Sequence, residues 1–286
     1  NHAIPRGGCD IFIRDFCRHC IFTCYWMNYT KPDNRFISVP NPSVYHYWEG
    51  LHNFPWVQHS LIVRNVTAVY LGSTLTMTAA HTKIRRAVTA QCSAHKDCLW
   101  KRVYHSSTDN RIGDFLASYQ HAVFCLNPPG DDPSRKGIFD SMVAGCIPVV
   151  FDVSTLYNQY PWHFTEQIAL DVSVFIPGKL VVSGQVNVMK VLSSISEEVI
   201  RKKQQAIAKI APSLQYSIPP FRLLLNASDT TRWEPPFEDS VDRILDGMFE
   251  RVERVKRNQS SGIPTRLMKV KEWIAEYSAV RIQVPE

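Results

Sequence analysis

A short polar stretch that follows a Pro-Pro-Gly turn has the residue types and spacing to bind an anion. Ser134 and Arg135 stand where a helix is expected to begin, and an apolar run precedes the turn that ends at Gly130. The free backbone N–H groups of residues 133–136 would carry partial positive charge toward a ligand. The Arg135 guanidinium would add donors suited to phosphate oxygens, and Gly130 would let a ligand approach the backbone closely. The stretch therefore predicts an anion site.

A carboxylate follows one to two turns further along the same expected helix. Asp140 could accept hydrogen bonds from ribose hydroxyls, so the segment has the ingredients of a pocket for a nucleotide diphosphate. It matches neither a Walker loop nor a G-x-G-x-x-G fingerprint. An exposed helix start with ordinary surface charges therefore stays open as the alternative at this point.

Strands and helices that alternate along the chain would position these residues. The pattern predicts a strand at 122–127, a helix at 133–144 and a strand at 147–151, with Asp132 as the helix cap and Pro133 as the first helical residue. Alternation of this kind is typical of an α/β fold with a parallel sheet. Ligands bind such sheets beyond the carboxyl ends of the strands, where the turn after the first strand lies.

Other segments extend the pattern, and Gly145 is expected to end the central helix in a left-handed conformation. Ser196 is a plausible cap for a later helix. We expect further strands at 61–72 and 172–177 and helices at 83–92, 112–122, 196–212 and 237–257. The chain divides into a partial N-terminal domain at 1–65, a Rossmann-like domain at 66–228 and a C-terminal helical segment at 229–286.

Composition narrows the class of protein. The 286 residues are 45% hydrophobic and 20% charged, which is ordinary for a globular protein, and no run of 18 apolar residues predicts a membrane span. The net charge is +6, and the lysines and arginines are dispersed along the chain. An excess of positive charge suits an anionic small molecule, and no nucleic-acid motif is present. Because the first residue is Asn1 rather than Met, we interpret the sequence as a fragment or trimmed chain.

Eight cysteines and four N-glycosylation sequons together favour the secretory lumen. Cys92 and Cys98 are close enough for a small disulfide loop, whereas Cys125 and Cys146 lie in apolar runs and are interpreted as buried thiols. Cysteines near Cys17 have the spacing of half a zinc site, but no second ligand pair follows. The sequons are at Asn28, Asn65, Asn226 and Asn258.

The run FCLNPPGDDPSRKGIFDSMVAGCIPVVF at 124–151 resembles the signature of the exostosin-like glycosyltransferases, family 47. It is most similar to the plant xyloglucan galactosyltransferase branch. The likeness continues through YNQYPWHF at 157–164 and SVFIP at 173–177. Upstream, IRRAVTAQC at 84–92 resembles the arginine-bearing helix of the family, and the order and spacing fit from about residue 60 to 215.

The resemblance implies a GT-B-like fold, with a Rossmann-type parallel-sheet donor domain and a partial N-terminal α/β domain. It also implies inverting transfer of a sugar, such as galactose, from a UDP-sugar to a polysaccharide or glycan acceptor, without a metal or other cofactor. Ser134 and Arg135 would hold the pyrophosphate and Asp140 the ribose, while Arg85 would approach the phosphates from the facing turn. These cations and helix N–H groups would stabilise the diphosphate leaving group.

On the acceptor side, the chain departs from the family pattern. RGGCDIFI at 6–13 is similar to a Gly-Arg-Asp-His-Phe segment and keeps Asp10, which would be the base that deprotonates the acceptor hydroxyl. However, Ile11 stands where histidine is expected. A turn or capping role for Asp10 stays open. His163 could contact the donor sugar or pack beside Trp162, and both alternatives stay open.

We therefore expect a glycosyltransferase in the Golgi lumen, which would be a type II membrane protein if an anchor precedes this sequence. The altered segment at Asp10 leaves an alternative, a catalytically silent homologue that binds a nucleotide sugar and supports a partner transferase. Asp131 and Asp132 are interpreted as turn and cap residues rather than as a metal-binding pair.

Overall fold

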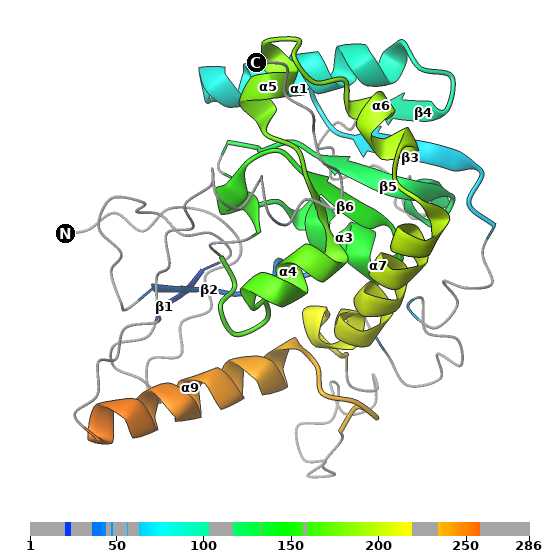
Figure 1. Ribbon diagram of the computed structural model, residues 1–286. Coiled ribbons are helices and arrows are strands. Elements are labelled where there is room, and N and C mark those ends of the chain that lie inside the picture. The colour runs from blue at the N-terminus through cyan, green and yellow to red at the C-terminus, as the bar shows by residue number, and fades with distance from the viewer. Residues whose placement is uncertain are drawn as a thin grey trace.

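A five-stranded parallel sheet forms the centre of the protein, with helices on both of its faces (Figure 1). This architecture confirms the predicted Rossmann-type α/β domain. The computed structural model describes residues 21–23, 36–43, 47, 56, 63–102, 117–131, 133–156, 159–218 and 234–257. Asp10 and the cysteines near Cys17 lie outside the described residues.

The winding of the sheet reverses between β3 and β5. The chain adds β4 on one side of β3 and then returns to add β5, β6 and β7 on the other side, with all neighbours parallel. Doubly wound sheets bind ligands where the winding reverses, beyond the carboxyl ends of the two strands. The five strands are β3 (Val66–Leu71), β4 (Cys98–Lys101), β5 (Ala122–Asn127), β6 (Ile147–Val150) and β7 (Val174–Phe175). A separate parallel pair comprises β1 (Ile21–Thr23) and β2 (Phe36–Ser38).

Helices cover the sheet in two layers. The first layer, on one face, contains α1 (Ala79–Ser93), α5 (Gly178–Val182) and α6 (Val188–Ser193). The second contains α3 (Lys136–Val143), α4 (Glu166–Val172) and α7 (Glu197–Ile210). The long helix α9 (Ser240–Lys256) runs along the edge of the second layer, and short 3₁₀ helices span Val153–Thr155 and Ala211–Leu214. In the described part of the chain, no helix is both long and apolar enough for a bilayer.

The strand β5 is apolar along its length because both of its faces are covered. Phe124 and Leu126 belong to the main core, whereas Cys125 belongs to a smaller cluster with Val69 and Tyr119. The alternation follows the two-residue period of a strand. The sequence Ala122–Asn127 was predicted as a buried strand, and the structure confirms these bounds.

Two disulfides join sequential elements of the sheet domain. Cys92, near the end of α1, is bonded to Cys98 at the start of β4, which confirms the predicted disulfide loop. Cys125 is bonded to Cys146, so the interpretation of these two residues as buried thiols is wrong. The parallel register places Phe124 opposite Ile147, and the Cα atoms of the two cysteines are 5.8 Å apart, within the range that a disulfide can span.

The central helix α3 begins three residues later than predicted. Arg135 occupies the N-cap position with an extended backbone (φ −148°, ψ 131°), so the prediction that Pro133 is the first helical residue is wrong. The predicted cap, Asp132, lies outside the described residues. The Ser134 hydroxyl lies 2.5 Å from the Tyr160 hydroxyl, a contact that holds the preceding stretch away from the helical path. The predicted left-handed Gly145 is confirmed by its φ of 72°.

The later helices agree well with the expectations. Ser196 caps α7 by accepting a hydrogen bond from the backbone N–H of Val199 at 3.4 Å. The helix predicted at 237–257 is α9, and the helix predicted at 83–92 begins earlier, at Ala79.

Candidate anion-binding site

Two arginines converge on the carboxyl ends of β3 and β5. Arg85, from the second turn of α1, donates from Nε to the carbonyl of Pro129 at 2.8 Å and from Nη1 to the carbonyl of Ser73 at 3.1 Å. Arg135 donates from Nη1 to the carbonyl of Pro128 at 2.8 Å. The accepting carbonyls belong to the loops that follow β3 and β5. Both guanidinium groups therefore lie at the reversal of the winding, where sequence and resemblance predicted them.

The two guanidinium groups form an electrostatically unfavourable pair. Burial, and then the charge of Arg135, lowers the pKa of Arg85 to about 10, so Arg85 is still a cation at neutral pH. Among the described residues, neither arginine forms an ion pair with a carboxylate. The charge of Asp131 attracts Arg85, and this attraction is the smallest of the effects on the pKa of Arg85. Two neighbouring cations without a carboxylate partner, at the ligand edge of a parallel sheet, are an arrangement that a bound anion would neutralise.

Hydrogen bonds tie the two loops of the site together. His81 Nδ1 donates to the carbonyl of Gly130 at 2.7 Å, and Thr78 Oγ1 donates to the carbonyl of Asp131 at 3.1 Å. The Asp131 carboxylate accepts a hydrogen bond from the backbone N–H of Met77 at 2.8 Å. Asp131 thus braces the loop, in agreement with its interpretation as a turn residue. The predicted close approach of a ligand to Gly130 stays a prediction.

Ser134 is buried, and its hydroxyl is already engaged. Besides Tyr160, it contacts Asn41, whose Nδ2 donates to the serine Oγ at 3.2 Å. The contact connects the N-terminal segment to the residue just before α3. The predicted role of Ser134 as a phosphate ligand stays a prediction, because in this structure its hydroxyl serves packing between three segments.

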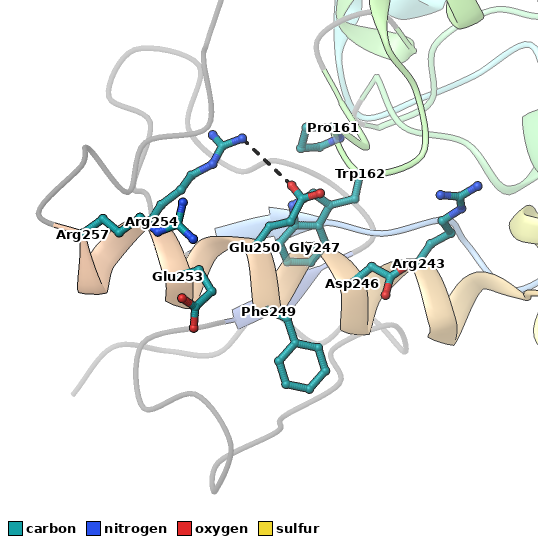
Figure 2. A pocket seen from close by; sticks show the side chains of 10 residues that line it. All are labelled: Pro161, Trp162, Arg243, Asp246, Gly247, Phe249, Glu250, Glu253, Arg254 and Arg257. Carbon is teal, nitrogen blue, oxygen red and sulfur yellow. Dashed lines mark ion pairs between the residues drawn. The ribbon is translucent and has the colours of Figure 1, made fainter.

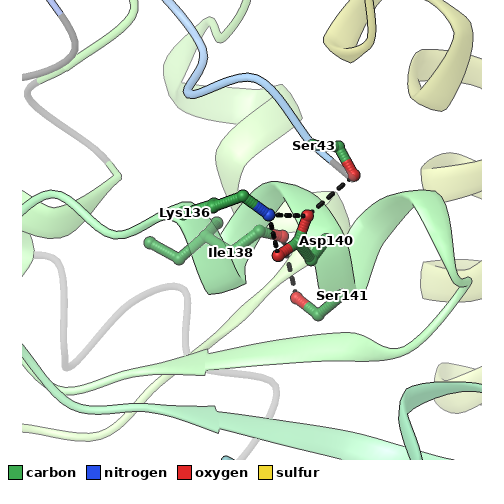
Figure 3. A network of polar contacts seen from close by, with 5 residues as sticks. All are labelled: Ser43, Lys136, Ile138, Asp140 and Ser141. Atoms are coloured by element: carbon green, nitrogen blue, oxygen red, sulfur yellow. Dashed lines mark hydrogen bonds and ion pairs between the residues drawn. The ribbon is translucent and has the colours of Figure 1, made fainter. Parts of the chain in front are cut away.

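Asp140 is held by a small polar network (Figure 3). Lys136 Nζ donates to the two carboxylate oxygens at 2.6 and 2.9 Å, one helical turn away on α3. Ser43 Oγ donates to the same carboxylate at 2.7 Å. Only 8% of Asp140 is exposed. The predicted ribose contact also stays a prediction, and it would have to use the acceptor capacity that Lys136 and Ser43 leave.

His163 is buried at the start of α9. Its Nε2 is 3.2 Å from Ser240 Oγ at the start of α9, and only 6% of the residue is exposed. Burial lowers the pKa of His163 to about 3, so the ring is neutral at physiological pH. The structure therefore places His163 in the packing at the start of α9. Its contact with the donor sugar stays a prediction.

The described residues contain no group of three or more histidine, cysteine, aspartate or glutamate side chains that could hold a metal ion. The predicted base Asp10 falls outside them, so its role stays a prediction.

Comparison with known proteins decides the family. The Exostosin GT47 domain matches residues 25–195, which is more than half of the chain and includes both arginines of the site. The chain belongs to the exostosin GT47 family. The family membership agrees with the resemblance found in the 124–151 signature and with the parallel-sheet fold.

The curated relatives include several proteins named as xyloglucan galactosyltransferases. "Probable xyloglucan galactosyltransferase GT12" of Arabidopsis thaliana is 34% identical over 180 residues, which are 63% of this chain and 33% of the relative. "Probable xyloglucan galactosyltransferase GT13" of the same plant is 40% identical over 128 residues, 45% of this chain and 26% of the relative. "Xyloglucan galactosyltransferase MUR3", also from Arabidopsis thaliana, is 26% identical over 227 residues, 78% of this chain and 34% of the relative. The GT47 chain spans between about a quarter and a half of the length of the relatives it matches.

Among solved structures, "Crystal structure of GtfA/B complex" aligns with a TM-score of 0.37 and 10% identity, covering 62% of this chain and 37% of that one. A likeness of this size adds nothing to the fold argument.

Sequence reasoning missed several residues that shape this GT47 site. Tyr70 lies under Arg135, and Asn41 and Ser43 reach α3 from the N-terminal segment. No local pattern links residues that are more than 90 positions apart. The Lys136–Asp140 pair did have a signal, because opposite charges four residues apart on a helix face each other.

Proposed function

We propose that this chain binds the UDP-sugar donor of an inverting glycosyltransferase that transfers a sugar, galactose by preference, to a polysaccharide such as xyloglucan. The observation that carries the proposal is the pair formed by Arg85 and Arg135, two neighbouring cations without a carboxylate partner in the described chain. A diphosphate would neutralise both. The names of the relatives support the acceptor class and do not favour the alternative of a catalytically silent homologue.

In the proposed reaction, the oxygen of an acceptor hydroxyl attacks the anomeric carbon of the donor sugar. The bond from that carbon to the phosphate oxygen breaks, and UDP leaves with an additional negative charge. Arg85 and Arg135 would stabilise this charge where it develops, which is the role that a metal ion plays in other transferases. The hydroxyl proton would pass to a carboxylate base, for which we retain Asp10 from the family resemblance.

We further propose that a second, facing domain completes a GT-B-like cleft and that the protein works in the Golgi lumen. Two disulfides and an exposed sequon residue, Asn65, support an oxidising secretory compartment. A membrane anchor upstream and a partner transferase remain part of the proposal.

Isothermal titration with UDP tests the proposal directly. Replacing Arg85 or Arg135 with alanine is expected to weaken UDP binding by about 1.5–3 kcal/mol, the scale of a hydrogen bond to a charged group. Arg86→Ala is the matched control, because Arg86 is the exposed neighbour of Arg85 on the same helix. This substitution removes the same charge from the helix. If Arg86→Ala weakens binding as much as Arg85→Ala, the assignment of the anion site is wrong.

Product analysis tests the transfer step. Incubation of the chain with UDP-galactose and xyloglucan is expected to release UDP and to add galactose to the polysaccharide. UDP binding without transfer to any acceptor in a panel of polysaccharides would leave donor binding intact and contradict the proposed transfer.

A further inference from the structure

A groove runs between α9 and the turn that carries Trp162 (Figure 2). Its volume is about 750 Å³, within the range of ordinary ligand pockets. One face of α9 forms the floor, because Arg243, Gly247, Glu250 and Arg254 are spaced at intervals of three and four residues. The groove is separate from the arginine pair at β3 and β5, and no step of the proposed donor chemistry uses it.

Trp162 packs directly on the backbone of α9. A Cβ atom placed on Gly247 would lie 2.2 Å from the indole ring, so only glycine permits this approach. Trp162 is half-buried, and it lines the groove beside Glu250 (Figure 2). An aromatic ring that lines a groove and is fixed by its support is a platform on which an apolar ring face can stack at little cost in conformational freedom.

The charges that line the groove cancel. Three arginines are matched by three carboxylates, so the groove has no net charge, unlike the arginine pair of the anion site. Glu250 and Arg254 are 4.0 Å apart, and Figure 2 shows both on the side of α9 that faces Trp162. Carboxylate and guanidinium groups supply paired acceptors and paired donors, which suit adjacent hydroxyls. The arrangement therefore fits a neutral ligand rich in hydroxyl groups better than a polyanion.

The same turn connects this groove to the start of α3. Tyr160, two residues before Trp162, places its hydroxyl 2.5 Å from Ser134 Oγ, next to Arg135. Tyr160 has a φ of 59°, a conformation that bulky residues rarely adopt and that costs free energy. The turn thus presents one side chain to the residues beside the anion site and another to the groove.

We propose that the groove binds a neutral, hydroxyl-rich glycan chain, the acceptor of the transfer, with Trp162 as the stacking platform and Glu250 and Arg254 as hydroxyl-binding groups. This inference rests on the proposed function for the identity of the glycan as the acceptor. Binding itself requires only the groove.

Titration of the full chain with a xyloglucan oligosaccharide, and separately with UDP, tests the inference. Trp162→Ala is expected to weaken oligosaccharide binding at least about tenfold, the loss of a stacked aromatic ring and its contacts. Glu250→Gln is expected to weaken it severalfold. Because 70% of the Glu250 side chain is exposed, this second variant leaves the fold unaffected and guards against misfolding of Trp162→Ala. UDP affinity should stay unchanged in both variants.

The matched control is Glu198→Gln, an equally exposed glutamate on α7 that forms a similar pair with Lys202. Unchanged oligosaccharide affinity in both Trp162→Ala and Glu250→Gln, or no oligosaccharide binding at all, overturns the inference. Tighter binding of an anionic oligogalacturonide than of the neutral oligosaccharide also overturns it. Failure of UDP to bind while the oligosaccharide binds through Trp162 would instead contradict the proposed donor site and leave the groove as a glycan site.

Discussion

Arg135, the N-cap residue of α3, lies over the ring of Tyr70 of β3, with 6.0 Å between the guanidinium carbon and the ring centroid. The hydroxyl of Tyr70 donates to the carbonyl of Ser73 at 2.6 Å, and the same carbonyl accepts from Arg85. One buried ring and one carbonyl therefore connect the two cations of the anion site. The loop after β3 is held by Arg85 and Tyr70 together, and the start of α3 is held against it through Arg135.

This relationship predicts different effects for two substitutions at Tyr70. Tyr70→Phe keeps the ring beneath Arg135 and should leave UDP affinity within about threefold of the wild type, because one neutral hydrogen bond contributes little net free energy. Tyr70→Leu removes the ring and should weaken UDP binding by about 1–2 kcal/mol, the scale of a desolvated cation–π contact. Isothermal titration measures both, with circular dichroism to confirm folding. Equal losses in the two variants would show that the ring does not position Arg135.

The network around Asp140 predicts a loss of stability. Asp140→Asn removes the charge that Lys136 and Ser43 contact, and it should lower the free energy of unfolding by about 1–3 kcal/mol. Urea denaturation measures the change. Asp246→Asn on α9 is the matched control, because Asp246 is exposed and should have almost no effect. A similar loss in the two variants would contradict a stabilising role for the network.

The same Asp140→Asn variant separates a ribose contact from a purely structural role. If Asp140 binds the ribose, the affinity for UDP should fall while the affinity for inorganic pyrophosphate stays unchanged. Parallel titrations with the two ligands measure this difference. Equal affinities for UDP in wild type and variant would assign Asp140 to the packing of α3 alone.

Burial of His163 predicts that stability decreases in acid. The folded protein holds the pKa of His163 at about 3, below the value near 6.5 of an unfolded chain. Between these two pKa values the unfolded chain binds one more proton at His163 than the folded chain. The stability that the neutral, buried ring contributes above pH 6.5 is therefore lost as the pH falls toward 3. The expected slope is about 1.4 kcal/mol per pH unit for this group. Urea denaturation at several pH values should show a shallower acid dependence for His163→Gln, and identical pH profiles would contradict the prediction.

The contact between Gly247 and Trp162 predicts an effect opposite to helix propensity. Gly247→Ala should stabilise an isolated helix by about 1 kcal/mol, but here the added methyl group would collide with the indole ring and destabilise the protein by about 1–3 kcal/mol. In a Trp162→Ala background the same substitution should become stabilising. Thermal or urea denaturation of the four proteins of this double-mutant cycle measures the coupling. Additive effects would mean that the two residues do not touch in solution.

The strands that flank the anion site could be predicted because each is a short apolar run bounded by turn residues. The start of α3 could not be predicted, since Pro133 suits a first helical position locally. The contacts that hold Ser134 come from Tyr160 and Asn41, 26 and 93 residues away in the sequence. The Cys125–Cys146 disulfide likewise could not be predicted from the sequence, because it depends on the register of β5 against β6. Register is a tertiary property that local patterns do not specify.

The arginine pair was predictable in a different way. Arg135 followed from the polar stretch at the expected helix start, whereas Arg85 came only from the family resemblance. Their convergence depends on the strand order, which brings the loops after β3 and β5 together. Tyr70 could not be recognised as a site residue, because within the sequence it is one more apolar position of a buried strand.

The hydrogen bonds that Asp131, Thr78 and His81 form between the two loops have a thermodynamic consequence. They fix the torsions of the loops before any anion arrives. A ligand that docks there has little backbone left to immobilise, so a larger part of its electrostatic attraction is retained as affinity. If the proposed anion binds there, the braced loops act as a rigid receptor that is formed in advance, and not as a clamp that must assemble around it.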